Sequence, residues 1–150
     1  MRRFRPALRR TSVTLAVVSL LAACASDAPT ETETLAGAYR ARVFRVTPPG
    51  QAEIDVLAAG GSLTITVGED NVTSGSLSLP ASVTGESALT ESMAGTVERT
   101  VTSSESVANF QFRQTADTFV RDLVWARNRD VLSVSNQSAG GARFTIMLAR

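Results

Sequence analysis

The chain has 150 residues, with fifteen Arg, fourteen acidic residues, one Cys and one Trp, and it contains neither His nor Lys. This length supports one compact domain with tails. Without His there is no Ser–His–Asp triad and no imidazole metal site. Without Lys there is no Schiff base and no P-loop lysine. These absences exclude much catalytic and metal chemistry, and together with the acidic groups discussed below they lead us to expect no catalytic residue, no metal and no cofactor.

The first 23 residues have the pattern of an export signal. Five Arg and no acidic residue precede an apolar stretch of thirteen residues, TSVTLAVVSLLAA, which ends at Ala23. That stretch is too short to cross a bilayer as a helix, which takes about 20 residues. It fits the short apolar core of a secretory signal peptide.

The export signal ends in Leu21-Ala22-Ala23-Cys24. This tetrapeptide resembles the lipobox of bacterial lipoproteins. The resemblance implies that the Cys24 thiol takes a diacylglyceryl group, that the signal is cut before Cys24, and that the new amino group is acylated. Several acyl chains on one residue anchor a protein stably to a membrane. The alternative is an ordinary secretory signal that happens to carry a Cys.

The charge changes sign when the signal is removed. Five of the fifteen Arg precede Cys24 and all fourteen acidic residues follow it, so the chain from Cys24 onward has a net charge of −4. An acidic domain without Lys is a poor nucleic-acid binder, because phosphate recognition requires clustered cations. The expected partner is a membrane, through the lipid anchor.

A small, polar and acidic segment, ASDAPTETET, follows Cys24 and ends at Thr34. We expect it to be a disordered tether with a reach of about 18 Å. In lipoproteins of this kind, the absence of Asp directly after the Cys favours the outer membrane. The predicted organisation is thus a signal peptide over 1–23, a lipidated Cys and tether over 24–34, and a domain over 35–150 facing the periplasm.

From Leu35 onward apolar residues alternate with polar ones, which is typical of half-buried strands. The clearest case is Ser62 to Val67, where Leu63, Ile65 and Val67 share one face. Val72 to Leu79 follows a Gly-containing turn and ends at Pro80. Other segments with strand signals are 38–46, 93–101, 110–112, 123–125, 132–134 and 144–148.

Two regions are ambiguous. Residues 51–60 suit a short helix or strand, and residues 81–91 suit a long loop, with a helical turn over 87–93 as the alternative. No long helical period follows Cys24. About eight strands predict an all-β fold, as a small antiparallel up-and-down barrel, since closure removes both exposed edges. A sandwich or another small barrel is the alternative.

The first strand opens with Gly37-Ala38-Tyr39. This resembles the Gly-x-Trp of lipocalins and related calycin barrels, with Tyr in place of Trp. In those proteins an Arg near the last strand packs across the Trp, and Arg150 suits that role through a cation–π contact. The resemblance implies that Tyr39 and Arg150 close one barrel end, and that a small apolar or amphipathic ligand is held inside.

Several Arg residues have positions that bear on a ligand. Arg99 has the parity of Val97 and, on a regular strand, points inward, where it can hold a carboxylate or phosphate. A strand end or an ion pair is the simpler interpretation. Arg45 has the same ambiguity and is expected at a barrel rim. Arg40 and Arg42 share an outward face, which suits lipid headgroups or, more simply, solvent.

The largest apolar side chains are candidates for a cavity wall: Phe110, Phe112, Trp125 and Phe144. A domain of this size also needs such residues merely to fill its core. A pocket of about 300 Å³ or more lined by them favours ligand binding, and a filled interior favours an envelope lipoprotein that acts on protein partners as an inhibitor or scaffold.

Two clusters of acidic residues could bind a metal ion or act in acid–base catalysis, but each has a simpler structural interpretation. Glu69-Asp70-Asn71 offers oxygen ligands suited to Ca²⁺, but three polar residues in a tight turn are typical of a turn alone. Glu53 and Asp55 alternate on one side, yet a carboxylate pair needs a shaped cleft for acid–base work. No cleft signal accompanies them, so we expect no hydrolase.

Overall fold

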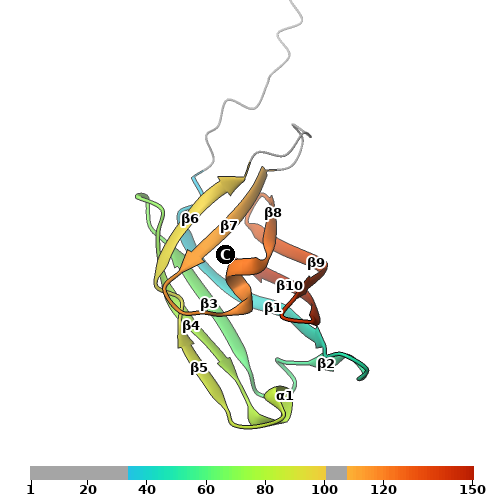
Figure 1. Cartoon of the computed structure of the whole chain (residues 1–150). Coiled ribbons are helices and arrows are strands. Elements are labelled where there is room, and N and C mark those ends of the chain that lie inside the picture. The colour runs from blue at the N-terminus through green and yellow to red at the C-terminus, as the bar shows by residue number, and fades with distance from the viewer. Residues whose placement is uncertain (1–33, 101–107) are drawn as a thin grey trace, which may run out of the picture. The chain divides into compact units, whose positions relative to one another are not determined.

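The computed structural model describes residues 34–100 and 108–150. The predicted signal peptide, the lipidation site, the tether up to residue 33 and the predicted strand end at 101 lie outside the described residues. The described chain is an antiparallel barrel of eight strands, with almost no helix (Figure 1). The predicted all-β barrel is confirmed.

The barrel strands follow one another around the wall in chain order, and the pairing of β10 with β1 closes the ring. The eight strands are β1 (Gly37–Thr47), β3 (Ser62–Val67), β4 (Val72–Leu79), β6 (Gly95–Thr100), β7 (Ala108–Gln114), β8 (Val124–Asn128), β9 (Val131–Ala139) and β10 (Ala142–Ala149). Closure leaves no long unpaired edge in this ring.

Two short strands extend the wall. β2 (Ile54–Asp55) pairs with the end of β1, so the ambiguous region 51–60 supplies a strand. β5 (Leu89–Ser92) pairs with the second half of β4, while β6 pairs with its first two residues. β5 occupies the place of the alternative helical turn over 87–93, and a single helical turn, α1 (Ala81–Thr84), follows Pro80 instead.

Gly75 lies where β4 changes partner from β6 to β5. Its φ is +132°, and a Cβ atom built there would lie 2.1 Å from the carbonyl oxygen of Thr64 on β3. The register between β3 and β4 runs on without a shift, so Gly75 marks a close approach of two backbones. Only a residue without a side chain fits there.

A β-bulge in β1 changes which residues face the interior. The register with β10 shifts between Ala41 and Val43, so that Tyr39 and Ala41 point inward before the bulge, and Phe44 and Val46 after it. The bulge contributes one extra residue to β1. Arg45, for which regular alternation gave an inward parity, is therefore exposed on the outer wall.

Aromatic side chains fill the middle of the barrel. Phe112 and Trp125 are both fully buried, and their rings meet edge to face with centroids 5.5 Å apart. Such pairs add roughly 0.5–1.5 kcal/mol to the free energy gained by burial. Leu132 and Leu148 are also fully buried. The centre of the barrel is thus a packed core.

The two ends of the barrel are built from different elements. The end at which β1 begins also carries the β3–β4 turn, the β8–β9 turn and Arg150, and we call it the tether end. The opposite end carries the β1–β2 connection, α1, the β9–β10 turn and the 3₁₀ helix η1 (Phe119–Asp122), and we call it the pocket end (Figure 1).

Candidate functional site

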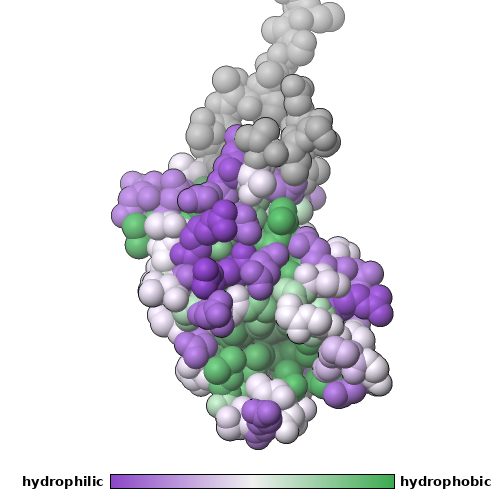
Figure 2. Space-filling view, in the orientation of Figure 1, coloured by the Kyte–Doolittle hydropathy of each residue, from purple (hydrophilic) through white to green (hydrophobic). Residues whose placement is uncertain are grey.

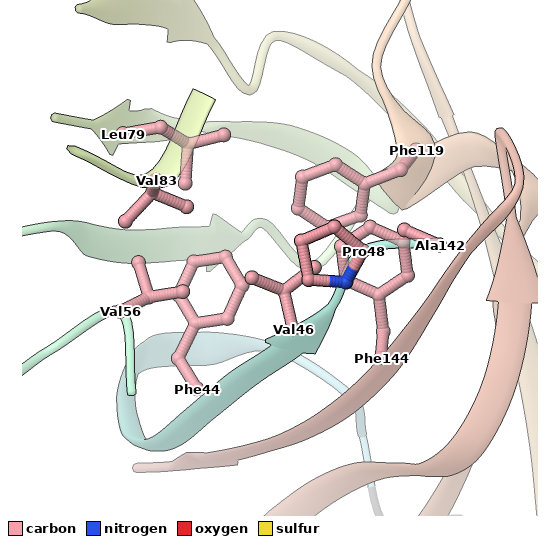
Figure 3. A pocket seen from close by; sticks show the side chains of 9 residues that line it. All are labelled: Phe44, Val46, Pro48, Val56, Leu79, Val83, Phe119, Ala142 and Phe144. Atoms are coloured by element: carbon pink, nitrogen blue, oxygen red, sulfur yellow. The ribbon is translucent and has the colours of Figure 1, made fainter. Parts of the chain in front are cut away.

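An apolar pocket of about 150 Å³ opens at the pocket end of the barrel. Figure 3 shows its side chains converging from strands on different sides of the wall and from both short helices. The lining residues are Phe44, Val46, Pro48, Val56, Leu79, Val83, Phe119, Ala142 and Phe144. All nine are apolar, so the pocket offers dispersion contacts and no side-chain hydrogen bond.

Three Phe rings form one wall of the pocket. The rings of Phe119 and Phe144 are stacked, with centroids 4.2 Å apart and an interplanar angle of 10°. Phe44 meets Phe119 at 6.0 Å in a tilted arrangement. The three residues come from β1, η1 and β10, so the wall forms only when the barrel closes.

The 3₁₀ helix η1 positions Phe119 at the pocket. Val120 in the same helix is fully buried, which fixes one side of η1 against the core. The side-chain amide of Gln111 on β7 donates a hydrogen bond of 3.0 Å to the carbonyl oxygen of Arg121. These contacts hold the single turn of helix against β7 and keep Phe119 beside Phe144.

The connection after β2 supplies another part of the pocket. The amide of Val56 donates to the carbonyl oxygen of Phe44 at 2.8 Å, and the amide of Gly61 donates to that of Val56 at 2.8 Å. The side chain of Val56 is fully buried. Leu79 at the end of β4 and Val83 in α1 lie across the pocket from Phe119 and Phe144 (Figure 3).

The pocket end presents apolar atoms to solvent. Figure 2 shows hydrophobic surface gathered in the lower part of the view, over the end that carries α1, with hydrophilic residues around it. Contiguous apolar surface on a water-exposed domain costs free energy in the unliganded state and commonly marks a binding site.

The four aromatic residues predicted as a cavity wall do not line one cavity. Phe144 lines the pocket, whereas Phe112 and Trp125 are packed into the filled middle of the barrel. Phe110 is partly buried against the core, and Arg99 is exposed near the end of β6. The pocket has about half the volume that we set as the mark of a ligand-binding interior.

Sequence reasoning missed two of the three rings that form the pocket wall. Phe44 has outward parity relative to Tyr39 on a regular strand, and only the bulge in β1 turns it inward. Phe119 lies in a 3₁₀ helix outside every predicted strand. The signal for Phe119 was an apolar pair, Phe119 and Val120, within an otherwise polar connection between predicted strands.

At the tether end, polar bonds tie β1 to the end of the chain. The hydroxyl of Tyr39 donates to the carbonyl oxygen of Leu35 at 2.9 Å. The Arg150 guanidinium donates to the carbonyl oxygen of Ala36 at 2.8 Å and pairs with Asp130. Both residues predicted to close a barrel end therefore bond to the chain that leads into β1.

Gly37 allows Arg150 to cross the start of β1. Its φ is +151°, and a Cβ atom there would lie 2.3 Å from Cδ of Arg150. The aliphatic part of Arg150 thus occupies the space that a side chain would fill. This close approach gives a physical reason for Gly at the first position of Gly37-Ala38-Tyr39.

Buried polar atoms without a hydrogen-bond partner occur in the segment from β7 to β8 of the described chain. They are both side-chain heteroatoms of Gln114, the hydroxyl of Thr118 and the indole nitrogen of Trp125. An unpaired buried polar group costs roughly 1–3 kcal/mol.

The acidic candidates serve local structure. Asp70 accepts a hydrogen bond from the amide of Val72 at 3.1 Å within the β3–β4 turn. Glu53 pairs with Arg45 at 3.3 Å, and Asp55 accepts from the amide of Ala58 at 3.1 Å. Over residues 34–100 and 108–150, no three acidic, His or Cys side chains lie close enough together to hold a metal ion.

Comparison of the chain with protein-family models, curated protein sequences and solved structures finds no match. Among the described residues there is no helix with the length and hydropathy needed to span a membrane.

Proposed function

We propose that this protein is a lipid-anchored, non-enzymatic binding protein of the cell envelope, which takes the apolar part of a small amphipathic molecule into the pocket end of its barrel. The observation that carries the proposal is the pocket whose nine lining residues are all apolar. The lipobox-like Leu21-Ala22-Ala23-Cys24 supports the proposed anchor and a location outside the cytoplasm. Attachment to the outer membrane, on its periplasmic side, completes the proposal.

The size of the pocket limits what enters it. A cavity of about 150 Å³ lined by aliphatic and aromatic side chains holds one benzene ring. The pocket of this protein has a similar volume, so it takes a single ring or a short stretch of hydrocarbon chain. The rest of the ligand stays in solvent, because small-molecule pockets that enclose a whole ligand run from about 300 to 1,000 Å³.

The lining predicts how ligands are selected. No lining residue carries a polar side chain, so the pocket has no side-chain group that distinguishes one headgroup from another. Affinity should follow the length of the hydrocarbon up to the capacity of the pocket. Each buried methylene contributes about 0.8 kcal/mol, which is roughly a fourfold change in affinity.

Binding of linear alcohols from butanol to dodecanol, measured by calorimetry, tests this proposal. We expect affinity to rise with chain length and then level off, and carboxylates of equal chain length to bind within a few fold of the alcohols. Ala142→Leu fills the pocket and should weaken binding at least tenfold. Ala126→Leu on the outer side of β8 is the matched control. A chain that binds none of these alcohols contradicts the proposal.

The anchor has its own test. Cys24→Ser removes the thiol that would carry the lipid, so the variant should leave the membrane fraction. Fractionation of cells that express the two forms measures this directly. Retention of the variant in the membrane fraction would contradict anchoring through Cys24.

A second function, contact with a protein partner, is favoured by the filled middle of the barrel, where Phe112 and Trp125 are fully buried. In that case the pocket would receive one apolar side chain of a partner, and the protein would act as an inhibitor or scaffold. Native mass spectrometry of the protein from its host separates the two functions. A co-purifying lipid supports ligand binding, and a bound protein on a lipid-free barrel supports the second function.

A further inference from the structure

Four neighbouring strands of the barrel wall, β3, β1, β10 and β9, contain no Asp or Glu. They contain four Arg, and all four are exposed. We call the outer surface formed by Arg40, Arg42, Val43, Arg45, Arg143 and Met147 the positive face. It is cationic although the chain from Cys24 onward has a net charge of −4.

The positive face has an apolar centre between cationic ends. Val43 on β1 lies directly opposite Met147 on β10 in the register, and Met147 is 41% exposed. Arg40 lies on the tether side of this pair, and Arg45 and Arg143 lie on the pocket side. The bulge in β1 is what turns Val43 outward beside Arg42.

Of these four Arg, carboxylates lie beside Arg45, and Asp55 of β2 is directly opposite it in the register. Arg45 pairs with Glu53 at 3.3 Å, and both side chains are about half exposed. Within the described ranges, Arg40, Arg42 and Arg143 lie near no acidic partner at ion-pair distance. On the opposite wall the situation differs, because Arg113 of β7 pairs with Glu98 of β6.

We propose that the positive face rests on an anionic phospholipid surface. Basic side chains around an exposed apolar group are the chemistry that binds a peripheral protein to such a surface. β1 begins only three residues before Arg40, so an anchor on the preceding segment would keep this strand within reach of the membrane. Tethering raises the effective concentration of the two surfaces and makes weak contacts sufficient.

An orientation with the positive face on the membrane would also bring the pocket close to the bilayer. Arg45 alternates along β1 with the pocket-lining Phe44 and Val46, and Arg143 lies on β10 between Ala142 and Phe144. The strands that form the positive face thus also form the pocket rim. With this face on the membrane, a hydrocarbon chain passes between pocket and bilayer along a short path.

The test uses the unlipidated chain that begins at Ala25, because residues 34–150 contain the whole closed barrel with its own core. Sedimentation with vesicles measures binding at low salt, with about 30% phosphatidylglycerol in phosphatidylcholine or with phosphatidylcholine alone. We expect binding to the anionic vesicles only, and Arg40→Gln with Arg42→Gln should weaken it roughly ten- to thirtyfold. Adding Arg143→Gln should weaken it further.

The matched control is Arg113→Gln with Arg121→Gln, which removes the same charge from the opposite side of the barrel. Its binding should stay within about twofold of the parent protein. An equal loss in both double variants, or no binding by the parent, overturns the proposal. Equally tight, Arg40- and Arg42-dependent binding to polyglutamate also overturns it, since the face would then be a site for acidic polymers.

The proposal is separable from ligand binding and from the anchor. The test protein lacks Cys24, so its result does not depend on lipidation. Ala142→Leu, which fills the pocket, should bind anionic vesicles as the parent does. If it binds vesicles but not alcohols, and the Arg variants do the reverse, the pocket and the positive face are two independent sites.

Discussion

The two ends of the barrel differ in how side chains cover the interior. At the tether end, Arg150 crosses Gly37 and bonds to Ala36 and Asp130, and the adjoining centre is filled by Phe112 and Trp125. At the pocket end, Phe44, Phe119 and Phe144 surround unfilled space. This chain thus has enough large side chains to fill the barrel centre but leaves one end open, which is where we propose that a ligand enters.

The filled centre should be the most sensitive to truncation. Trp125→Ala removes the largest fully buried side chain and its edge-to-face contact with Phe112, so we expect the free energy of unfolding to fall by about 3–5 kcal/mol. Urea denaturation measures the change. Trp125→Phe should cost much less, because the indole nitrogen has no partner to lose. Similar costs for both variants would mean that the indole makes a bond in solution.

The same substitution at the two ends should have opposite consequences. Ala41 is 8% exposed and points into the packed interior, so Ala41→Leu should destabilise the protein by about 1–3 kcal/mol through overpacking. Ala142 lines the pocket, so Ala142→Leu should be neutral or stabilise it by up to about 1 kcal/mol. Urea denaturation of both variants measures the two changes in the free energy of unfolding. A large loss at Ala142 would show that the pocket is closed in solution.

The unpaired polar atoms give a prediction of intermediate size. Gln114 is 4% exposed and neither heteroatom of its side chain has a partner. Gln114→Met keeps the length of the side chain and removes the unpaired amide, so we expect a gain of about 1–2 kcal/mol in thermal or chemical unfolding. A loss of stability would show instead that the amide is hydrogen-bonded in solution.

The ion pair at the tether end should matter least. The side chains of Arg150 and Asp130 are 39% and 61% exposed. Exposed pairs contribute at most about 1 kcal/mol, so Asp130→Asn should lower stability by less than that. The effect should shrink further in high salt, since mobile ions screen exposed charges. Thermal melts at low and high ionic strength check both statements, and a loss that is independent of salt would contradict them.

Strand positions were predictable where apolar and polar residues alternate and where Gly or Pro marks the end of the segment. Residues 62–67 and 72–79 were predicted with the bounds that the structure has, because alternation, strict in the first segment and confined to Leu77 and Leu79 in the second, is bordered there by Gly and Pro. The number of such segments was enough to predict a closed barrel. These signals are local, so they can be recognised in the sequence without knowledge of tertiary contacts.

The pocket was not predictable for reasons that are specific to its residues. Phe44 faces inward only because β1 contains a bulge, and a bulge depends on pairing with β10, which is distant in the chain. Phe119 is placed by a 3₁₀ helix whose position depends on Gln111 and Val120. Likewise, alternation shows that Phe112 and Trp125 face inward, but not whether they line a space or fill it.

The most direct test of the central claim locates a bound hydrocarbon. Nuclear magnetic resonance of the barrel with octanol should show contacts from the terminal methyl protons of the alcohol to the rings of Phe44, Phe119 and Phe144. Those rings line the pocket, whereas Phe112 and Trp125 do not. Contacts to Phe112 or Trp125 instead, or no contact with any of the five rings, would contradict ligand capture at the pocket end.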